Sequence, residues 1–165
     1  MEHWDAYDRN GNKLSFDLVR GMPIPANVYH LLCDTVVIHQ DGTYLLMQRD
    51  YRAKTWAGMF QVGAGGHAIK GETPVECAIR ELREETGILC SELKELYISI
   101  VDDEQAIFYG YLCVTDCAKN SVRLQEGETI AYKWVSKDEF VAYMDSEDCM
   151  DTQKVRLTDY VNSIR

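Results

Sequence analysis

The fold is decided by the stretch Gly66-His-Ala-Ile-Lys-Gly-Glu-Thr-Pro-Val-Glu-Cys-Ala-Ile-Arg-Glu-Leu-Arg-Glu-Glu-Thr-Gly-Ile88. Its second half has the start and stop signals of a helix. Thr73 can accept a hydrogen bond from an early helical amide, Pro74 suits the first helical position, and Glu76 completes a capping box with Thr73. Gly87 can adopt the left-handed conformation that closes a helix. We therefore expect a helix from about Pro74 to Thr86.

This helix would carry three carboxylates on one face. At about 100° per residue, Glu81, Glu84 and Glu85 fall within an arc of about 100°, where like charges repel one another. A bound cation would relieve that repulsion, and oxygen ligands suit Mg²⁺ or Mn²⁺. Glutamates on a helix more often form a solvated face. Here, however, the glycine-rich residues 62–66 would let backbone carbonyls approach an ion, and Arg80 can orient the carboxylates.

The stretch resembles the signature of the Nudix hydrolases. The matching positions are Gly66, Glu72, Arg80, Glu81, Leu82, Glu84, Glu85, Gly87 and Ile88. The resemblance implies a Nudix-like α/β/α sandwich and Mg²⁺-assisted attack of water on phosphorus in a nucleoside diphosphate derivative. The roles it implies are metal ligation by Glu81, Glu84, Glu85 and the Gly66 carbonyl, proton acceptance by Glu81 or a loop acid, and salt-bridge support from Arg80 and Glu72. Glu81, Glu84, Glu85 and Arg80 would thus form the catalytic set.

Outside this stretch the chain is rich in short strands. The expected strands cover residues 4–7 and 13–19 around Asn10-Gly11, 30–38 and 44–49 around Asp41-Gly42, and 59–62, 93–101, 106–115 and 130–135. Two further helices are expected, one after Ser136 through about Tyr143 and one over 153–164. Strands interrupted by helices predict an α/β fold with a mixed β-sheet between helical layers. We expect one domain over 1–165, with an N-terminal β-hairpin extension (1–27) and a core (28–165).

The composition limits the classes of partner. The 165 residues carry 17 basic and 27 acidic side chains, so the net charge is −10, which argues against binding of nucleic acid through its phosphates. No apolar run is long enough to span a membrane. The N-terminus lacks a basic region followed by an apolar run, and the six cysteines form no C-x-x-C pair. We therefore expect a cytoplasmic protein with reduced thiols.

A second resemblance widens the range of possible activities. Residues 2–12 and 28–32 are similar to the opening of Nudix proteins related to isopentenyl-diphosphate isomerase. Those isomerases use a cysteine and a histidine in a Cys-Ser-His-Pro-like segment ahead of the signature, whereas this chain has Gln61-Val-Gly-Ala-Gly-Gly-His67 there. The isomerase therefore stands as an alternative to the hydrolase. A domain that senses a nucleotide derivative without cleaving it is another, although such a domain would be expected to have lost signature carboxylates.

Substrate-binding residues are expected beside the signature. Arg49 and Trp56 bound a loop that would help to set specificity, and Trp56 can line a pocket. His67 adjoins the metal-binding loop, where it can contact substrate. Among Glu104, Glu126 and Glu128, we favour Glu128 as an extra metal ligand or general base. The expected partner is a small-molecule diphosphate, and a homodimer would pair through the N-terminal hairpin.

Overall fold

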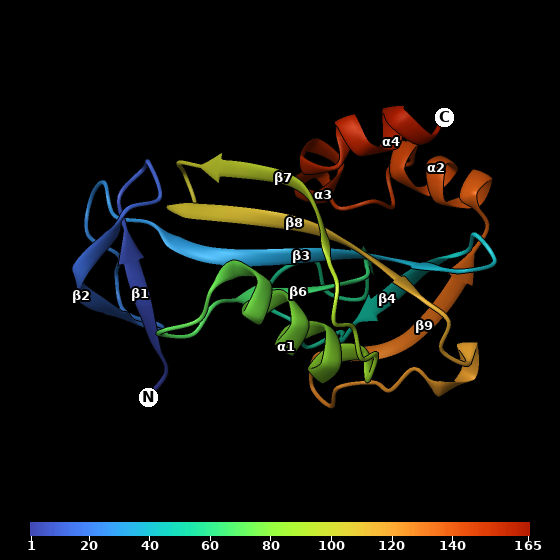
Figure 1. Ribbon diagram of the computed structural model, residues 1–165, viewed down its shortest axis with the longest axis horizontal. Coiled ribbons are helices and arrows are strands. Elements are labelled where there is room, and N and C mark those ends of the chain that lie inside the picture. Colours follow the sequence, from blue (N-terminus) through green and yellow to red (C-terminus); the bar gives the residue numbers. More distant parts are fainter.

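A long central strand, β3 (His30–His39), organises the main sheet of the computed structural model, which describes residues 1–165 (Figure 1). The sheet has seven strands in the order β5-β4-β3-β8-β7, with β6 paired to β3 and β9 paired to β4. The other strands are β4 (Tyr44–Arg49), β5 (Phe60–Val62), β6 (Ala64–His67), β7 (Lys94–Val101), β8 (Ala106–Thr115) and β9 (Thr129–Val135). β3 runs parallel to β8 and antiparallel to β6, so the prediction of a mixed sheet is confirmed.

The hairpin predicted for β3 and β4 is formed only at its turn. Ile38 and Tyr44 are the single residue pair that joins the two strands. Beyond that pair β4 diverges to bind β5 and β9, and β6 occupies the vacated edge of β3 from Leu32 to Thr35. The sheet therefore splits between β4 and β6.

The glycine-rich segment is a strand in part, rather than the loop that we expected. Ala64 to His67 form β6, and Gly63 turns the chain into it with a φ of +57°. A Cβ atom at residue 63 would collide with the carbonyl oxygen of Thr35. Glycine is required here because only a bare backbone can turn this close to β3.

Two helical layers cover the sheet. α1 (Pro74–Thr86) has the predicted Thr73 capping box and ends at Gly87, whose φ is +74°. α2 (Lys137–Asp145) begins after Ser136 as predicted. The helix predicted over 153–164 is instead two helices, α3 (Asp151–Arg156) and α4 (Thr158–Ile164), because the chain bends at the buried Leu157. A short 3-10 helix, η1, spans Lys119–Ser121.

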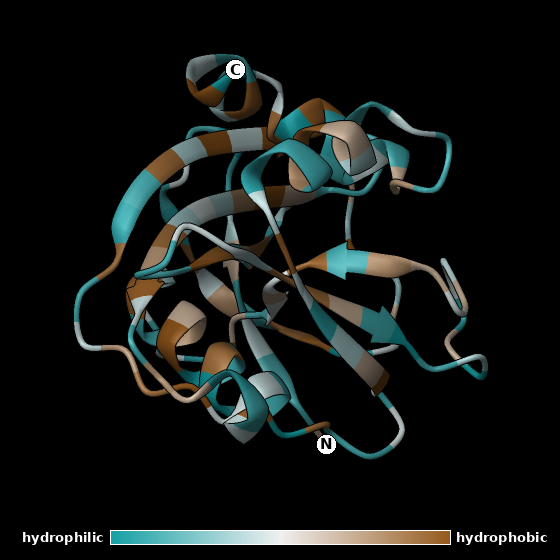
Figure 2. Ribbon diagram, turned by 90° about the vertical axis from the view of Figure 1, so that its right-hand side faces the viewer, coloured by the Kyte–Doolittle hydropathy of each residue, from teal (hydrophilic) through white to brown (hydrophobic).

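The core lies on both faces of β3, which confirms the α/β/α sandwich. Figure 1 shows α1 on one face of the sheet and α2, α3 and α4 on the other. Val36 packs in a cluster with Phe140 of α2 and Leu157, whereas the next residue, Val37, packs with Leu82 of α1. Successive side chains of a strand point to opposite faces, which explains this division. Figure 2 shows hydrophobic residues along the strands between the helical layers.

The predicted N-terminal hairpin is present as a separate two-stranded sheet, β1 (His3–Tyr7) and β2 (Lys13–Val19). It contacts the loop that precedes α1, where the Gly71 amide donates to Asp5 Oδ2 at 2.8 Å. The Lys70 amide donates to the His3 carbonyl at 2.8 Å. The division into an extension (1–27) and a core (28–165) stays a prediction. No helix of the chain has the length and apolarity needed to cross a bilayer.

Candidate active site

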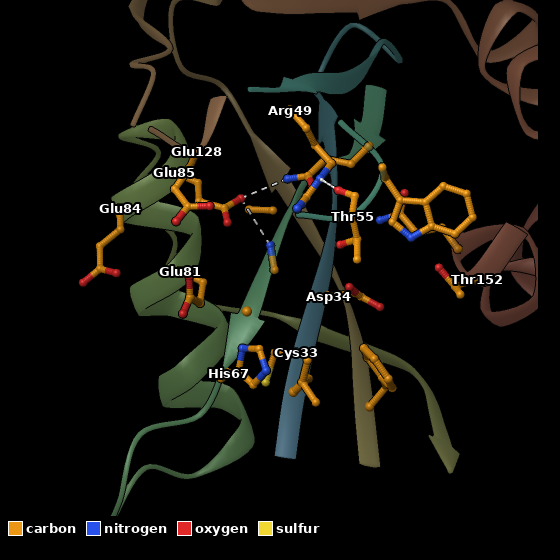
Figure 3. Close-up of a pocket in the computed structure, with 18 of the residues that line it drawn as sticks. Cys33, Asp34, Arg49, Thr55, His67, Glu81, Glu84, Glu85, Glu128 and Thr152 are labelled. Atoms are coloured by element: carbon orange, nitrogen blue, oxygen red, sulfur yellow. Dashed lines mark hydrogen bonds between the residues drawn. The ribbon is translucent and has the colours of Figure 1, made fainter. Parts of the chain in front are cut away.

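A cavity of about 710 Å³ lies beside α1, where the sheet splits. All of the predicted site residues except Glu72 line it: Arg49, Trp56, Gly66, His67, Arg80, Glu81, Glu84, Glu85 and Glu128. Figure 3 shows the labelled glutamates on the α1 side of the cavity and Asp34 and Thr152 across from them. The fold therefore brings residues from 49 to 128 to one place.

Arg80 joins the loop before α1 to the carboxylates of α1. Its Nε and Nη2 atoms donate to the two carboxylate oxygens of Glu72 at 2.6 and 2.9 Å. Its Nη1 atom donates to Glu81 at 2.7 Å and to Glu84 at 3.1 Å, and Nη2 also donates to the His67 carbonyl at 2.9 Å. This geometry agrees with the supporting salt bridge expected of Arg80 and Glu72.

Glu85 is the most enclosed of the three carboxylates, with 7% of its surface exposed. Its Oε2 atom accepts hydrogen bonds from Gln61 Nε2 at 3.2 Å and from the Gly65 amide at 3.4 Å. Burial, together with the negative charge of Glu81, raises the pKa of Glu85 to about 8. Burial also raises the pKa of Glu81. A nearby cation would favour the charged form of both groups.

The three carboxylates do not converge on one point. No group of three or more acidic, histidine or cysteine side chains is arranged to hold an ion directly. Glu81 and Glu84 are bound to Arg80, Glu85 is bound to Gln61, and Figure 3 shows Glu84 directed away from the other two. Sequence spacing placed them on one face, but their side chains have different partners.

The donor set nevertheless fits a hard divalent cation. Every candidate ligand offers oxygen, as Mg²⁺ and Mn²⁺ prefer. A Cβ atom at Gly66 would lie 2.5 Å from the carboxylate carbon of Glu81, so the bare backbone at Gly66 makes room for that carboxylate. The Gly66 carbonyl faces the α1 side, since Cys77 Sγ approaches it at 3.7 Å. Its role as a ligand stays a prediction.

Arg49 differs from the other arginines of the cavity. Arg20, Arg80 and Arg156 each form an ion pair with a carboxylate. Arg49 instead donates from Nη1 to Gln61 Oε1 at 2.9 Å and from Nε to the Thr55 carbonyl at 3.2 Å. Its positive charge has no carboxylate partner, so it is available to an anionic substrate.

His67 has a more enclosed place than its position beside Gly66 suggests. Its ring stacks on Trp4 of the N-terminal hairpin at 4.5 Å between centroids and on His30 at 5.1 Å. Burial, followed by the influence of His30, lowers the pKa of His67 to about 4. The ring is therefore neutral at pH 7, and it packs against the rings of Trp4 and His30.

The two remaining predicted residues lie at the border of the cavity. Trp56 is 37% exposed and has a φ of +54°, a backbone conformation that is uncommon for residues other than glycine. Glu128 is exposed, and Figure 3 shows it next to Glu85, whose pKa its charge helps to raise. The positions of both residues suit contact with a ligand.

Several residues that shape the cavity were not predicted. Asp34 and Arg156 line the wall opposite α1 and form an ion pair at 2.8 Å. Gln153, also in the lining, accepts from the Val62 amide through Oε1 at 2.9 Å. The one signal in the sequence was Asp34, the only acidic residue in a largely apolar strand. Arg156 and Gln153 gave no local signal.

Comparison with known proteins supports the assignment of residues 66–88 as a Nudix signature. A family model for the NUDIX domain matches residues 29–155. An uncharacterized Nudix hydrolase of Listeria monocytogenes is 27% identical over 147 residues, covering 88% of this chain and 86% of the relative. The isopentenyl-diphosphate Delta-isomerase of Corynebacterium diphtheriae is 26% identical over 121 residues, covering 68% of this chain and 66% of the relative.

Solved structures agree on the fold. The crystal structure of DR0079 from Deinococcus radiodurans superposes with a TM-score of 0.67 at 16% identity, covering 87% of this chain and 88% of that one. At this identity the likeness concerns the fold alone. The NUDIX match, in contrast, extends over well more than half of the chain and includes the whole signature. The protein therefore belongs to the Nudix domain family and is a pyrophosphohydrolase of the Nudix type.

Proposed function

We propose that this protein hydrolyses a diphosphate linkage in a nucleoside diphosphate derivative with the help of Mg²⁺ or Mn²⁺. The observation that carries the proposal is the pairing of two features in one cavity. Three carboxylates of α1 border it at one end, and Arg49, without a carboxylate partner, lies beside Gln61, which binds Glu85. The volume of about 710 Å³ also suits a small-molecule substrate.

In this proposal Glu81, Glu84 and Glu85 hold the divalent cation, with the Gly66 carbonyl as a further ligand. A bound cation would offset the charge of the diphosphate and lower the pKa of coordinated water. Arg49 binds a phosphoryl oxygen through its free donors. Arg80 positions Glu81 and Glu84.

The proton of the attacking water needs an acceptor. Glu81 and Glu128 both border the cavity and are the candidates for the general base. No cysteine or serine nucleophile is required, since water attacks phosphorus directly. His67 is not assigned this role, because its ring is stacked and its pKa is lowered to about 4.

The proposal is tested by a screen with Mg²⁺ over dinucleoside polyphosphates, nucleotide sugars, coenzymes such as NADH, nucleoside triphosphates and isoprenoid diphosphates. We expect hydrolysis of at least one diphosphate linkage. In Glu84→Gln we expect kcat/KM to fall at least about a hundredfold, equivalent to about 2.7 kcal/mol of transition-state stabilisation. Glu95→Gln is the matched control, because Glu95 is exposed on β7 and outside the cavity. Full activity of Glu84→Gln, or full activity in excess chelator, would refute the metal assignment.

The isomerase alternative has one observation in its favour, the relative from Corynebacterium diphtheriae. Isomerisation of an isoprenoid double bond needs a paired acid and base at the substrate. Cys33 is the only cysteine that lines the cavity, and it is 1% exposed with its thiol donating to the Pro74 carbonyl. The neighbouring Cys77 thiol and burial raise the pKa of Cys33, so this thiol is a poor substitute. Conversion of isopentenyl diphosphate to its isomer, followed by NMR, would establish the alternative.

We also propose a reducing compartment such as the cytoplasm, because all six cysteines are free. The homodimer through the N-terminal hairpin stays a prediction, which sedimentation analysis at several protein concentrations would test.

A further inference from the structure

We propose that Arg156 and Asp34 form a subsite for a nucleobase on the wall of the cavity opposite α1. The inference rests on the proposed function, because the base would belong to the nucleoside diphosphate derivative. It assigns a part of the substrate to a part of the cavity that the Nudix signature does not reach. Figure 3 shows Asp34 across the cavity from the labelled glutamates.

The subsite is built and held by buried contacts. Arg156 of α3 donates from Nε to Asp34 Oδ2 at 2.8 Å, and the two side chains are 7% and 15% exposed. Tyr97 donates its hydroxyl to the same Asp34 oxygen at 2.6 Å. The guanidinium of Arg156 lies over the Phe108 ring, 3.9 Å from its centroid. These contacts fix both charged groups in place before any ligand arrives.

Each partner keeps hydrogen-bonding capacity that no protein group uses. Asp34 Oδ1 accepts no hydrogen bond, and the Nη1 and Nη2 atoms of Arg156 have no carboxylate acceptor, although the Tyr97 hydroxyl also lies near the guanidinium. The only buried side-chain oxygen or nitrogen without a hydrogen-bond partner is on Asp5, in the N-terminal hairpin. The free atoms of Arg156 and Asp34 are therefore accessible, and both residues line the cavity.

Gly65 leaves the acceptor uncovered. It pairs with Asp34 across β3 and β6, and a Cβ atom at residue 65 would lie 2.5 Å from the Cys33 carbonyl oxygen and 2.9 Å from Asp34 Oδ1. The amide of the same glycine donates to Glu85 at 3.4 Å. The acceptor of the subsite and the carboxylate end of the cavity therefore meet at one residue, so that a single ligand can reach both.

A donor beside an acceptor selects a ligand with the complementary pair. The edge of a nucleobase presents such a pair, a ring nitrogen or carbonyl next to an N–H group. An isoprenoid chain would cover the free groups of Arg156 and Asp34 without pairing them, which is unfavourable for buried polar atoms. A sugar presents hydroxyl groups, which can donate and accept, but it lacks the planar donor–acceptor edge of a base, so it serves as the comparison ligand.

The test measures binding by titration calorimetry in EDTA, so that no turnover is involved. The probes are AMP, GMP, CMP, UMP, ribose 5-phosphate and isopentenyl diphosphate. We expect at least one nucleoside monophosphate to bind at least about tenfold more tightly than the other two probes, as one or two good hydrogen bonds allow. In Arg156→Lys and Asp34→Asn we expect this preference to fall below about threefold, whereas Arg83→Lys, an exposed arginine of α1, keeps it.

Equal binding of ribose 5-phosphate or isopentenyl diphosphate by the wild-type protein would overturn the subsite, as would an undiminished preference in Arg156→Lys. Because these measurements use metal-free protein, the subsite can stand if hydrolysis is absent. Hydrolysis without any preference among the bases would refute the nucleobase subsite but leave the proposed hydrolase function standing.

If the variants do not fold, the subsite is tested by amide hydrogen exchange of the wild-type protein with each ligand bound. We expect the nucleoside monophosphate, compared with ribose 5-phosphate, to protect residues 32–36 and 151–157. Equal protection by both ligands would overturn the inference.

Discussion

Replacing Glu85 with glutamine is expected to stabilise the metal-free protein at alkaline pH. The Glu85 carboxylate is 7% exposed, and its burial together with the charge of Glu81 raises its pKa from 4.5 to about 8. A raised pKa means that the folded protein binds this proton more tightly than the unfolded chain does. The stabilisation of the folded protein by protonated Glu85 is therefore fully present below about pH 4.5 and is lost as the pH rises through about 8.

The size of the expected stabilisation follows from the difference between the pKa of Glu85 in the folded protein and in the unfolded chain. Each pKa unit corresponds to about 1.4 kcal/mol, so ionising Glu85 in the folded protein costs at most about 5 kcal/mol. Water that enters around the ionised carboxylate reduces the cost, and we expect 2 to 5 kcal/mol, on the order of the values for buried ionisable groups. Glutamine is neutral at every pH and keeps an oxygen that can accept from the Gly65 amide.

The measurement is urea unfolding in EDTA between pH 5 and pH 9, followed by circular dichroism. The free energy of unfolding of Glu85→Gln is expected to exceed that of the wild-type protein at pH 9 and to approach it at pH 5. Glu95→Gln, with an exposed carboxylate, is the matched control. Added Mn²⁺ is expected to stabilise the wild-type protein more than the variant, because a ligand stabilises the state that binds it. A difference that is absent at pH 9, or equal at pH 5 and pH 9, would refute the reasoning.

Two further substitutions test the positions of cavity residues. Gln153→Leu removes the hydrogen bonds at 2.9 and 3.4 Å to the amide and carbonyl of Val62, and urea unfolding is expected to show a loss of about 2–4 kcal/mol. A loss below about 1 kcal/mol would mean that these contacts do not hold β5 in place. Arg49→Met is expected to raise KM for the hydrolysed diphosphate at least about tenfold in steady-state kinetics, with Arg49→Lys intermediate. An unchanged KM would remove Arg49 from the substrate site.

The parts of the structure that could be predicted are those fixed by neighbours in the chain. The cap at Thr73 and the stop at Gly87 each act over three or four residues, and the helix between them was predicted correctly. The burial of Glu85, in contrast, could not be predicted from its neighbours in the chain. Helical spacing places it beside Glu81, but its burial depends on Gln61 and Gly65, which reach it from β5 and β6.

The errors arose where distant segments decide the structure. The turn between β3 and β4 has ordinary hairpin chemistry, yet β6 rather than β4 pairs with β3 from Leu32 to Thr35, because glycines let β6 pack closely against β3. The bend at Leu157 depends on a core that includes Val36, far away in the sequence. The ion pair of Arg156 and Asp34 joins residues 122 positions apart. No local pattern specifies such a contact.

The two ends of the cavity therefore depend on different parts of the chain. The carboxylate end is almost wholly a product of one stretch, in which Arg80 binds Glu72, Glu81 and Glu84. The opposite wall is assembled from β3, β8 and α3, and it meets the carboxylate end at Gly65. Because Arg156 makes no contact with the α1 carboxylates, substitutions at this residue can change which group is accepted while the hydrolytic end keeps its geometry. A variant of Arg156 that changes base preference but retains the sensitivity to Glu84→Gln would show this separation directly.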